Sequence, residues 1–394
     1  MNSSYKDDTL KARLPVEVIL LIIESLIPGT THRRPILPAS HVVTKTLLNL
    51  TLVSKAIYPL SSRLLWQNCL RIESKESLRL FRDFVSRESI VTGRRPCDAY
   101  GSTRLFLCPF SRPRLHSPVP VSIDGEAREE AIHHPVYSPG SPYYPKLKDY
   151  DTIEAVNEVL ITLAPVLKAI IVDMPLRSLY PEDDDTGIRR LLREGFEALV
   201  NVEELVSIND ELYLDTKEDQ SEPEVWTKWP KLQRLALYNV VTQPELWKNM
   251  LLCPQLEMAV LSRSDGSEGG TSEEDIKDQW SRAWTEATSQ GTMSFEDRVP
   301  YQGREAIIAF CDWNSCLPKL DAFTNRWERL DPDNLIWIMT VPFDQPYNPA
   351  LTGYAYHYPD VPKNWIRGRA LRGSLWDDVY TERCGSTSKS DQHG

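Results

Sequence analysis

Few residues in this chain of 394 have the type and spacing that chemistry requires. The most prominent acidic cluster is Asp183-Asp184-Asp185, and neighbouring carboxylates can bind a metal ion or act as acid and base. The cluster also directly precedes a helix expected over residues 187–195, where acidic side chains cap free backbone amides. We interpret it as a helix cap and keep a metal-dependent hydrolase or transferase as the alternative.

The other candidate ligands and nucleophiles have unsuitable spacings. Cys311 and Cys316 have no second Cys or His pair at the distance of a structural zinc site, so we expect buried thiols. His133 and His134 lie in a proline-rich stretch without a nearby Cys or acid cluster. The glycine-rich stretch that begins at Gly266 lacks the Lys-Ser/Thr of a phosphate-binding loop. We therefore expect no metal and no cofactor, and predict that the protein is not an enzyme.

Composition narrows the class of protein further. With 45 Lys and Arg against 56 Asp and Glu, the net charge is −11, which argues against a nucleic-acid partner. Hydrophobic residues make up 41% and charged residues 26%, as in water-soluble globular proteins. Seven cysteines without a disulfide-like spacing indicate a reducing compartment, cytoplasmic or nuclear. The longest apolar run, Val18 to Ile23, is far shorter than the ~20 residues of a membrane span.

The elements that would position any site begin with three helices. Residues 1–12 are polar and expected to be disordered, whereas apolar residues from Leu14 onward recur every three or four positions, as on one helix face. Pro28-Gly29 ends this helix, and Pro59 separates a second, mostly apolar helix from a third. We therefore expect a small helical module over residues 13–70.

The next stretch, residues 71–150, is expected to connect this module to a larger region. Leu70 and Ile72 can form a short strand, and Glu73 to Arg87 is amphipathic. Eight prolines between Pro109 and Pro145 favour a long loop.

Residues 151–345 combine short apolar segments with helical stretches, which indicates an α/β fold. The expected strands are Leu167–Val172, Val202–Ile208, Leu232–Leu237, Leu256–Leu261, Ala306–Phe310 and Leu335–Val341. Segments that begin at Pro165, Pro230 and Pro254 share the pattern P-x-L-x-x-(L/A)-x-L or its Ile/Val equivalent, and Pro318 begins a weaker copy.

The spacings between these segments run from 24 to 64 residues, whereas leucine-rich repeats have periods of about 20–29. We expect an irregular, leucine-rich-repeat-like array in which strand-plus-helix units stack into a curved parallel sheet with a broad protein-binding surface. The 64-residue interval contains residues 262–278, which we expect to be a surface insertion. Residues 346–384 are expected to wrap around or cap the array, and residues 385–394 to be disordered.

One compound motif points to function. Leu14-Pro15-Val16-Glu17-Val18, then Leu50 to Lys55 (LTLVSK) and Leu64-Leu65-Trp66, resemble the F-box in order and chemistry. Three downstream segments, residues 105–110, 173–181 and 371–376, resemble F-box proteins of filamentous fungi. A longer loop between the first two helices, residues 29–45, departs from the basic motif.

The resemblance implies a substrate-recognition subunit of a Skp-cullin-F-box (SCF) ubiquitin ligase, which acts in ubiquitin conjugation without catalysis of its own. The helical module would dock on a Skp-type linker protein and, through it, on a cullin, while residues 150–345 would capture an unidentified protein substrate. The alternative is an F-box/leucine-rich interaction scaffold that acts outside a cullin ligase, and a plain helical cap on the repeat array is the non-functional reading. Residues assigned to linker binding are Leu14, Pro15, Glu17, Val18, Ile22, Leu26, Leu50, Val53, Ser54, Lys55 and Trp66.

Overall fold

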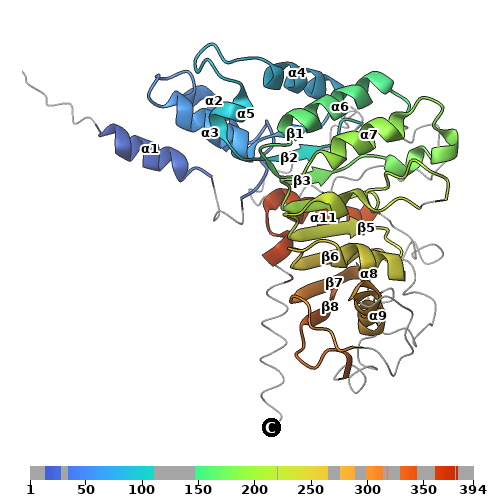
Figure 1. Cartoon of the computed structure of the whole chain (residues 1–394). Coiled ribbons are helices and arrows are strands. Elements are labelled where there is room, and N and C mark those ends of the chain that lie inside the picture. Colours follow the sequence, from blue (N-terminus) through green and yellow to red (C-terminus); the bar gives the residue numbers. More distant parts are fainter. Residues whose placement is uncertain are drawn as a thin grey trace, which may run out of the picture.

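Eight strands form a single parallel sheet whose spatial order, β1 to β8, is the order along the chain (Figure 1). This computed structural model describes residues 14–27, 34–110, 147–219, 221–264, 276–288, 299–313, 317, 329–343, 360–377 and 379. The strands are β1 Arg71–Ile72, β2 Thr103–Leu107, β3 Leu167–Val172, β4 Glu204–Ser207, β5 Arg234–Tyr238, β6 Met258–Ser262, β7 Ala306–Trp313 and β8 Ile336–Phe343.

The register of the strands aligns apolar side chains into rows on both faces. Alternate residues of a strand point to opposite faces. One row consists of Leu105, Ile170, Leu205, Leu235, Ala259, Ile308 and Ile338. The adjacent row, on the opposite face, consists of Phe106, Ile171, Val206, Ala236, Val260, Ala309 and Met339. Both faces must therefore be covered, as is usual for a parallel sheet.

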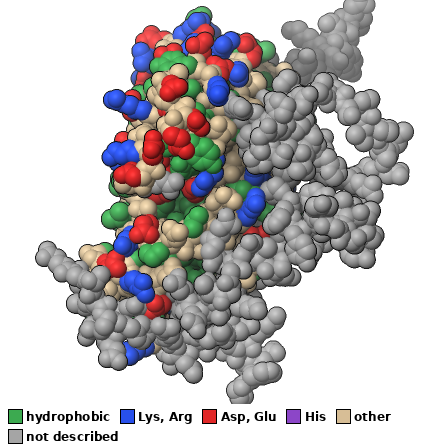
Figure 2. Space-filling view, turned by 90° about the vertical axis from the view of Figure 1, so that its right-hand side faces the viewer, with side chains coloured by type: hydrophobic (Ala, Val, Ile, Leu, Met, Phe, Trp, Pro, Cys, Tyr) green, Lys and Arg blue, Asp and Glu red, His purple; other side chains and the backbone are tan. Residues whose placement is uncertain are grey.

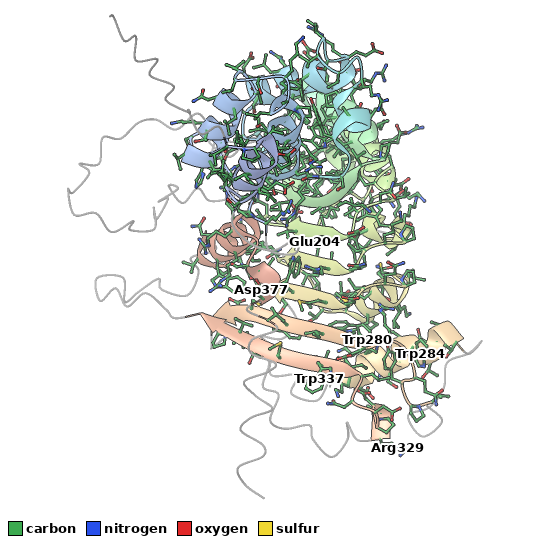
Figure 3. All side chains as sticks on the ribbon, turned by 90° about the vertical axis from the view of Figure 1, so that its left-hand side faces the viewer. Glu204, Trp280, Trp284, Arg329, Trp337 and Asp377 are labelled. Atoms are coloured by element: carbon green, nitrogen blue, oxygen red, sulfur yellow. The ribbon has the colours of Figure 1, made fainter. Side chains whose placement is uncertain are left out.

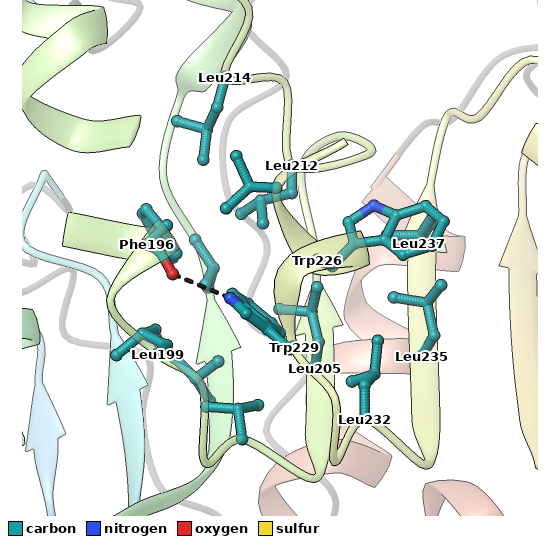
Figure 4. Packing of buried hydrophobic residues seen from close by; sticks show 14 of the residues in the cluster. Phe196, Leu199, Leu205, Leu212, Leu214, Trp226, Trp229, Leu232, Leu235 and Leu237 are labelled. Carbon is teal, nitrogen blue, oxygen red and sulfur yellow. Dashed lines mark hydrogen bonds between the residues drawn. The ribbon is translucent and has the colours of Figure 1, made fainter. Parts of the chain in front are cut away.

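A helix layer covers the first face (Figure 1). Its helices are α4 Lys75–Ser86, α6 Tyr150–Leu163, α7 Ile188–Glu197, α8 Pro244–Leu251 and α9 Ile276–Thr288, with three short 3-10 helices, η1 Leu176–Ser178, η2 Pro181–Asp183 and η3 Val225–Lys228. Tryptophans fill the space between the layers: the indole N–H of Trp229 donates to the carbonyl oxygen of Phe196 at 2.9 Å, beside Leu205 of β4 (Figure 4). In the described ranges, no helix has the length and hydropathy needed to cross a bilayer.

A single C-terminal helix covers much of the second face. This helix, α11 Asp360–Arg372, lies on the opposite side of the sheet from the helix layer (Figure 1). Its Ile366, together with Leu375 and Trp376 just beyond its end, is buried against the second row. The N-terminal segment joins the same cover, because Ile36 is buried there and its backbone N–H donates to the carbonyl oxygen of Leu371 at 2.8 Å.

Three N-terminal helices form a unit beside the first strands. They are α1 Val16–Glu24, α2 Val42–Leu50 and α3 Tyr58–Asn68, and a short helix, α5 Pro96–Tyr100, precedes β2. Pro15 is the N-cap residue of α1, and Pro59 lies in the first turn of α3. A proline is tolerated there because the first amides of a helix have no intrahelical partner.

The expected α/β class, the three N-terminal helices, the short strand near Leu70 and all six expected strands are confirmed. Strand β2 and the position of α9 differ from the expected arrangement. Strand β2 lies within a segment expected to connect two regions, so the sheet begins at Arg71, and α9 begins inside the expected insertion. Residues 1–12, 111–146, 318–325 and 385–394 lie outside the described residues, as do most of residues 346–384 other than α11 and the turn after it.

Helices α6 and α7 lie close together at Gly195. A Cβ atom at this position would lie 2.6 Å from Oδ1 of Asn157 and 3.3 Å from its Cα. Because the nearby Cα belongs to the backbone of α6, we expect Gly195→Ala to push the helices apart and lower the free energy of unfolding by about 1–3 kcal/mol. Chemical denaturation measures this change.

The matched control is Gly368→Ala in α11. Its Cβ would meet only the end of the Arg372 side chain, at 3.4 Å. We expect this variant to keep or raise the free energy of unfolding by up to about 1 kcal/mol, because alanine favours the helix. Equal destabilisation of both variants would contradict the close approach at Gly195.

Candidate docking surface

The N-terminal unit, α1 to α3, has a small apolar core of its own. Ile23 of α1, Leu47 of α2 and Leu64 of α3 are buried together. An ion pair of 3.0 Å between Arg63 and Glu24 also joins α3 to α1, but both side chains are about half exposed, so the pair adds little stability. Apolar contact therefore holds the unit together.

Helix α1 is apolar on its outer side as well. Leu14 is 61% exposed, Leu21 65% and Ile22 51%, and Val16 and Val18 are also exposed. A surface helix normally presents polar residues to solvent, and a helix that is apolar all round is normally covered. This outer face is thus suited to contact with another molecule.

The turn between α2 and α3 extends the apolar surface. Leu52 is 85% exposed and Val53 64%, although their backbone N–H groups donate to the carbonyl oxygens of Asn49 and Leu50. The Ser54 hydroxyl accepts from the N–H of Ile57, the residue before α3, at 3.3 Å. A hydrogen-bonded turn therefore holds these two side chains in solvent. We call the exposed apolar side chains of α1, α2 and this turn the docking surface: Leu14, Val16, Val18, Leu21, Ile22, Val42, Leu48, Leu52 and Val53.

Exposed apolar residues concentrate at this end of the molecule. Of the 20 large apolar side chains that are exposed among the described residues, nine form the docking surface and 13 lie between Leu14 and Val91. By contrast, the face in Figure 2 shows acidic and basic side chains interspersed with small apolar areas.

The residues assigned to linker binding from the sequence lie in three environments. Leu26 and Leu50 are half-buried and pack against the core of the unit. Trp66 is only 2% exposed. The exposed residues are Leu14, Pro15, Glu17, Val18, Ile22, Val53, Ser54 and Lys55.

Trp66 joins the unit to the sheet. Its indole N–H donates to the carbonyl oxygen of Gly101 at 2.9 Å, its ring stacks on Phe81 with centroids 6.4 Å apart, and its carbonyl oxygen accepts from the Thr103 hydroxyl. A partner molecule cannot reach this ring. Of the two roles that the sequence allowed, core or interface, the burial of Trp66 supports the core.

The sequence reasoning missed five members of the docking surface, Val16, Leu21, Val42, Leu48 and Leu52. A signal existed for one of them, because the unbroken apolar run from Val18 to Ile23 is longer than a one-sided helix requires. The others lie on α1, on α2 or in the turn after α2, and the sequence does not show which sides of these elements stay exposed.

Helix α11 occupies part of the sheet face that was expected to capture a substrate. Asp173 at the end of β3 pairs with Arg367 at 3.2 Å and accepts from the amide of Asn209. Lys363 in turn donates to Asn209 at 3.0 Å and lies 5.1 Å from the ring centre of Tyr238. These contacts fix α11 along its length.

Glu204 of β4 is, after Asp173, the second acidic residue of the sheet that holds the C-terminal segment in place. Its carboxylate pairs with Arg104 of β2 at 3.3 Å and with Arg234 of β5 at 3.1 Å, and it accepts from the indole N–H of Trp376. Figure 3 shows Glu204 on the sheet, and Asp377 next to it in the segment that follows α11. The face across β2 to β5 is therefore filled by this chain's own residues.

An open hollow lies at the amino ends of β5, β6 and β7. Its lining consists of Gln233, Pro254, Gln255, Glu257, Arg304, Glu305 and Ile307. The guanidinium of Arg304 already donates to the carbonyl oxygens of Leu256 and Met250, so it closes the end of α8. The hollow therefore presents polar side chains at the accessible amino ends of these three strands.

The acidic cluster caps α7. The Asp184 carboxylate accepts from the N–H groups of Ile188 at 2.9 Å and Arg189 at 2.7 Å, which confirms the capping interpretation. No group of three or more His, Cys, Asp or Glu side chains that could hold a metal ion occurs in the described part of the chain.

The described cysteines are free thiols, and Cys108, Cys253 and Cys311 are buried. Cys311 is buried, as expected, and burial raises its pKa, whereas Cys316 lies outside the described residues. Burial also raises the pKa of Cys253 to about 12. Both thiols therefore stay protonated and unreactive at neutral pH.

Comparisons with protein-family models, with curated proteins and with solved structures find no match for this chain.

Asp210 is the most deeply buried acid beside the sheet. It is 1% exposed and accepts from the N–H groups of Leu212 and Tyr213, at 2.9 and 3.3 Å, and from the Ser207 hydroxyl. Burial, and then the charge of Glu211, raise its pKa to about 7. The protonated form is thus favoured in the folded protein.

This shift predicts a pH dependence of stability. The unfolded pKa of an aspartate is about 3.9, so the stability that Asp210 contributes is present below about pH 4 and is lost as the pH rises to about 7. Between these pH values, the free energy of unfolding of the wild type should fall relative to Asp210→Asn, by at most roughly 4 kcal/mol.

Denaturant titrations of both proteins from pH 4 to 8 measure this difference. Glu224, whose pKa is raised to about 8 by burial and, as the smallest contribution, by the charge of Asp210, contributes in the same direction in both proteins, so most of its contribution cancels in the comparison. A difference that does not change with pH would show that Asp210 ionises normally.

Proposed function

We propose that this protein is a substrate-recognition subunit of an SCF ubiquitin ligase. Helices α1 to α3 dock on a Skp-type linker subunit, and the sheet region captures a protein substrate. The observation that supports this most is the docking surface, which is apolar and exposed on a unit whose sequence resembles an F-box.

The energetic reason is the cost of exposed apolar surface. Covering one leucine or isoleucine side chain completely contributes about 1.5–3 kcal/mol. Leu14, just before α1, and Leu21 and Ile22 on it are each more than half exposed, and Leu52 and Val53 are exposed in the turn after α2. A protein partner that covers these side chains together gains enough to offset the cost of association. A large exposed apolar patch is typical of such an interface.

The proposed role needs no catalytic group in this chain. A receptor that holds a substrate near a ubiquitin-charged enzyme raises the effective concentration of the two reactants. The capped Asp184 and the unreactive buried thiols agree with this role. We place the protein in a reducing compartment, cytoplasmic or nuclear, because its seven cysteines show no disulfide-like spacing.

The position of α11 narrows the substrate-binding surface that we propose. Since α11 fills the sheet face over β2 to β5, a substrate would contact the amino ends of β5 to β7, where the hollow near Glu257 lies. We regard the stacked strand-and-helix units as an irregular leucine-rich-repeat-like array, because all strands are parallel and follow chain order.

The test is a binding measurement with a purified Skp-type linker subunit. We expect Leu14→Ser with Leu21→Ser to weaken binding at least tenfold, because both side chains lose apolar contact. Since both residues are exposed, the thermal midpoint should stay near that of the wild type. Isothermal titration calorimetry gives the affinity, and circular dichroism gives the midpoint.

The matched control is Val241→Ser with Leu252→Ser, which removes two exposed apolar side chains from the region around α8. This control should bind like the wild type. If the wild type does not bind the linker, or if the α1 variant binds as tightly as the control, the proposed docking is incorrect. Recovery of the linker without any cullin from native complexes would select the scaffold that acts outside a ligase.

A further inference from the structure

A second apolar surface follows α4. Ile90 is 103% exposed and Val91 60%, and the outer side of α4 exposes Leu80 and Phe84 as well. The F-box match ends near residue 70 and the resembling segments downstream begin at residue 105, so the resemblance assigns nothing to these side chains. They need a physical explanation, because apolar exposure on this scale is costly.

The turn of residues 89–94 holds its apolar side chains outward. The N–H of Ser89 donates to the carbonyl oxygen of Arg94 at 2.9 Å, and the N–H of Gly93 donates to that of Ser89 at 2.7 Å. The Ser89 hydroxyl also accepts from the N–H of Val91 at 3.2 Å. Gly93 has a φ of 63°, a conformation that favours glycine. The apolar side chains are thus exposed by an ordered, internally bonded turn.

This turn lies beside the docking surface. The hydroxyls of Tyr58 and Ser89 are 3.5 Å apart, which places the turn at the start of α3. The N–H of Tyr58 donates to the carbonyl oxygen of Ser54, the residue directly after Val53. Both Ser54 and Ser89 therefore contact Tyr58, which brings the turn that contains Leu52 and Val53 and the turn that contains Ile90 and Val91 to the same end of α3.

The surroundings of this surface are basic, unlike the rest of the chain. Residues 1–110 contain 16 Lys and Arg against 9 Asp and Glu, a net charge of +7, which leaves −18 for the remainder. Lys55, Arg94 and Arg95 are exposed next to the apolar side chains, and two acids, Glu88 and Asp98, are exposed there too. A partner that covers this surface is favoured if it is acidic.

We propose that the 89–94 turn is a second contact region for the linker subunit, and that the linker places apolar side chains with acidic neighbours against it. This inference rests on the proposed function and extends its interface beyond the three-helix unit. Leu52, Val53, Ile90 and Val91 form the apolar centre, and Lys55, Arg94 and Arg95 form a basic rim. The rim makes association depend on ionic strength, because exposed charges are screened by salt.

Two variants of the full chain test the inference against a purified Skp-type linker. Ile90→Ser with Val91→Ser should weaken binding at least tenfold. Arg94→Glu with Arg95→Glu should weaken binding at low salt and reduce the loss of affinity between 50 and 300 mM NaCl. Val241→Ser with Leu252→Ser is the apolar control, and Arg190→Glu, at another exposed arginine, is the charge control. Both controls should bind like the wild type.

The outcomes separate the two proposals. If the wild type and the Ile90 and Val91 variant bind the linker equally well, the second contact is overturned and the docking through α1 remains. If the Arg94 and Arg95 variant keeps the affinity and salt dependence of the wild type, the acidic character of the contact is overturned. If the wild type does not bind the linker at all, the proposed function itself fails. Circular dichroism confirms that each variant is folded, which is expected because every substituted side chain is exposed.

Discussion

The structure depends on one constraint, namely that both faces of its parallel sheet are apolar. The row through Leu105 and Ile170 requires the helix layer, and the row through Phe106 and Ile171 requires a second cover. The strands follow chain order, and α6, α7, α8 and α9, the described α-helices between β2 and β7, all lie on the first face. The second cover has to come from segments outside the array, and the chain supplies α11 and the segment around Ile36. Two distant parts of the sequence thereby complete one core.

Half-buried charges determine where α11 lies. Glu204 receives donors from two strands and from Trp376, and Asp173 pairs with Arg367. Each carboxylate would be costly to leave without its partners, so another position of α11 is disfavoured. These contacts specify one arrangement, while the apolar row below α11 supplies most of the stabilisation. The same arrangement fills the second face over β2 to β5 and leaves the amino ends of β5 to β7 for a proposed substrate.

In the N-terminal unit, unlike in the sheet, the chain does not cover all of the apolar surface. Its core around Leu47 is small, and several of its apolar side chains are exposed in ordered helices and turns. Trp66 joins this unit to α4 and β2 through its ring and its indole N–H, so the unit has a defined position on the sheet. A partner that docks on α1 and on the turn after α2 would therefore hold the sheet region at a fixed orientation, which suits a receptor that presents a substrate.

The sequence by itself determined the local structure. The periodicity of apolar residues located six strands and the three N-terminal helices, and the prolines at 15 and 59 located two helix starts, since these signals depend on near neighbours along the chain. The acidic cap at Asp184 was found for the same reason. Only the tertiary structure decided which apolar residues are covered, because burial depends on residues far apart in sequence. It placed Trp66 in the core and Val53 in solvent, added β2 to the sheet, and put α11 on the second face. The periodicity of apolar residues shows which side chains share one face of a helix or strand. Contacts with distant segments of the chain determine whether that face is covered or remains exposed for a partner.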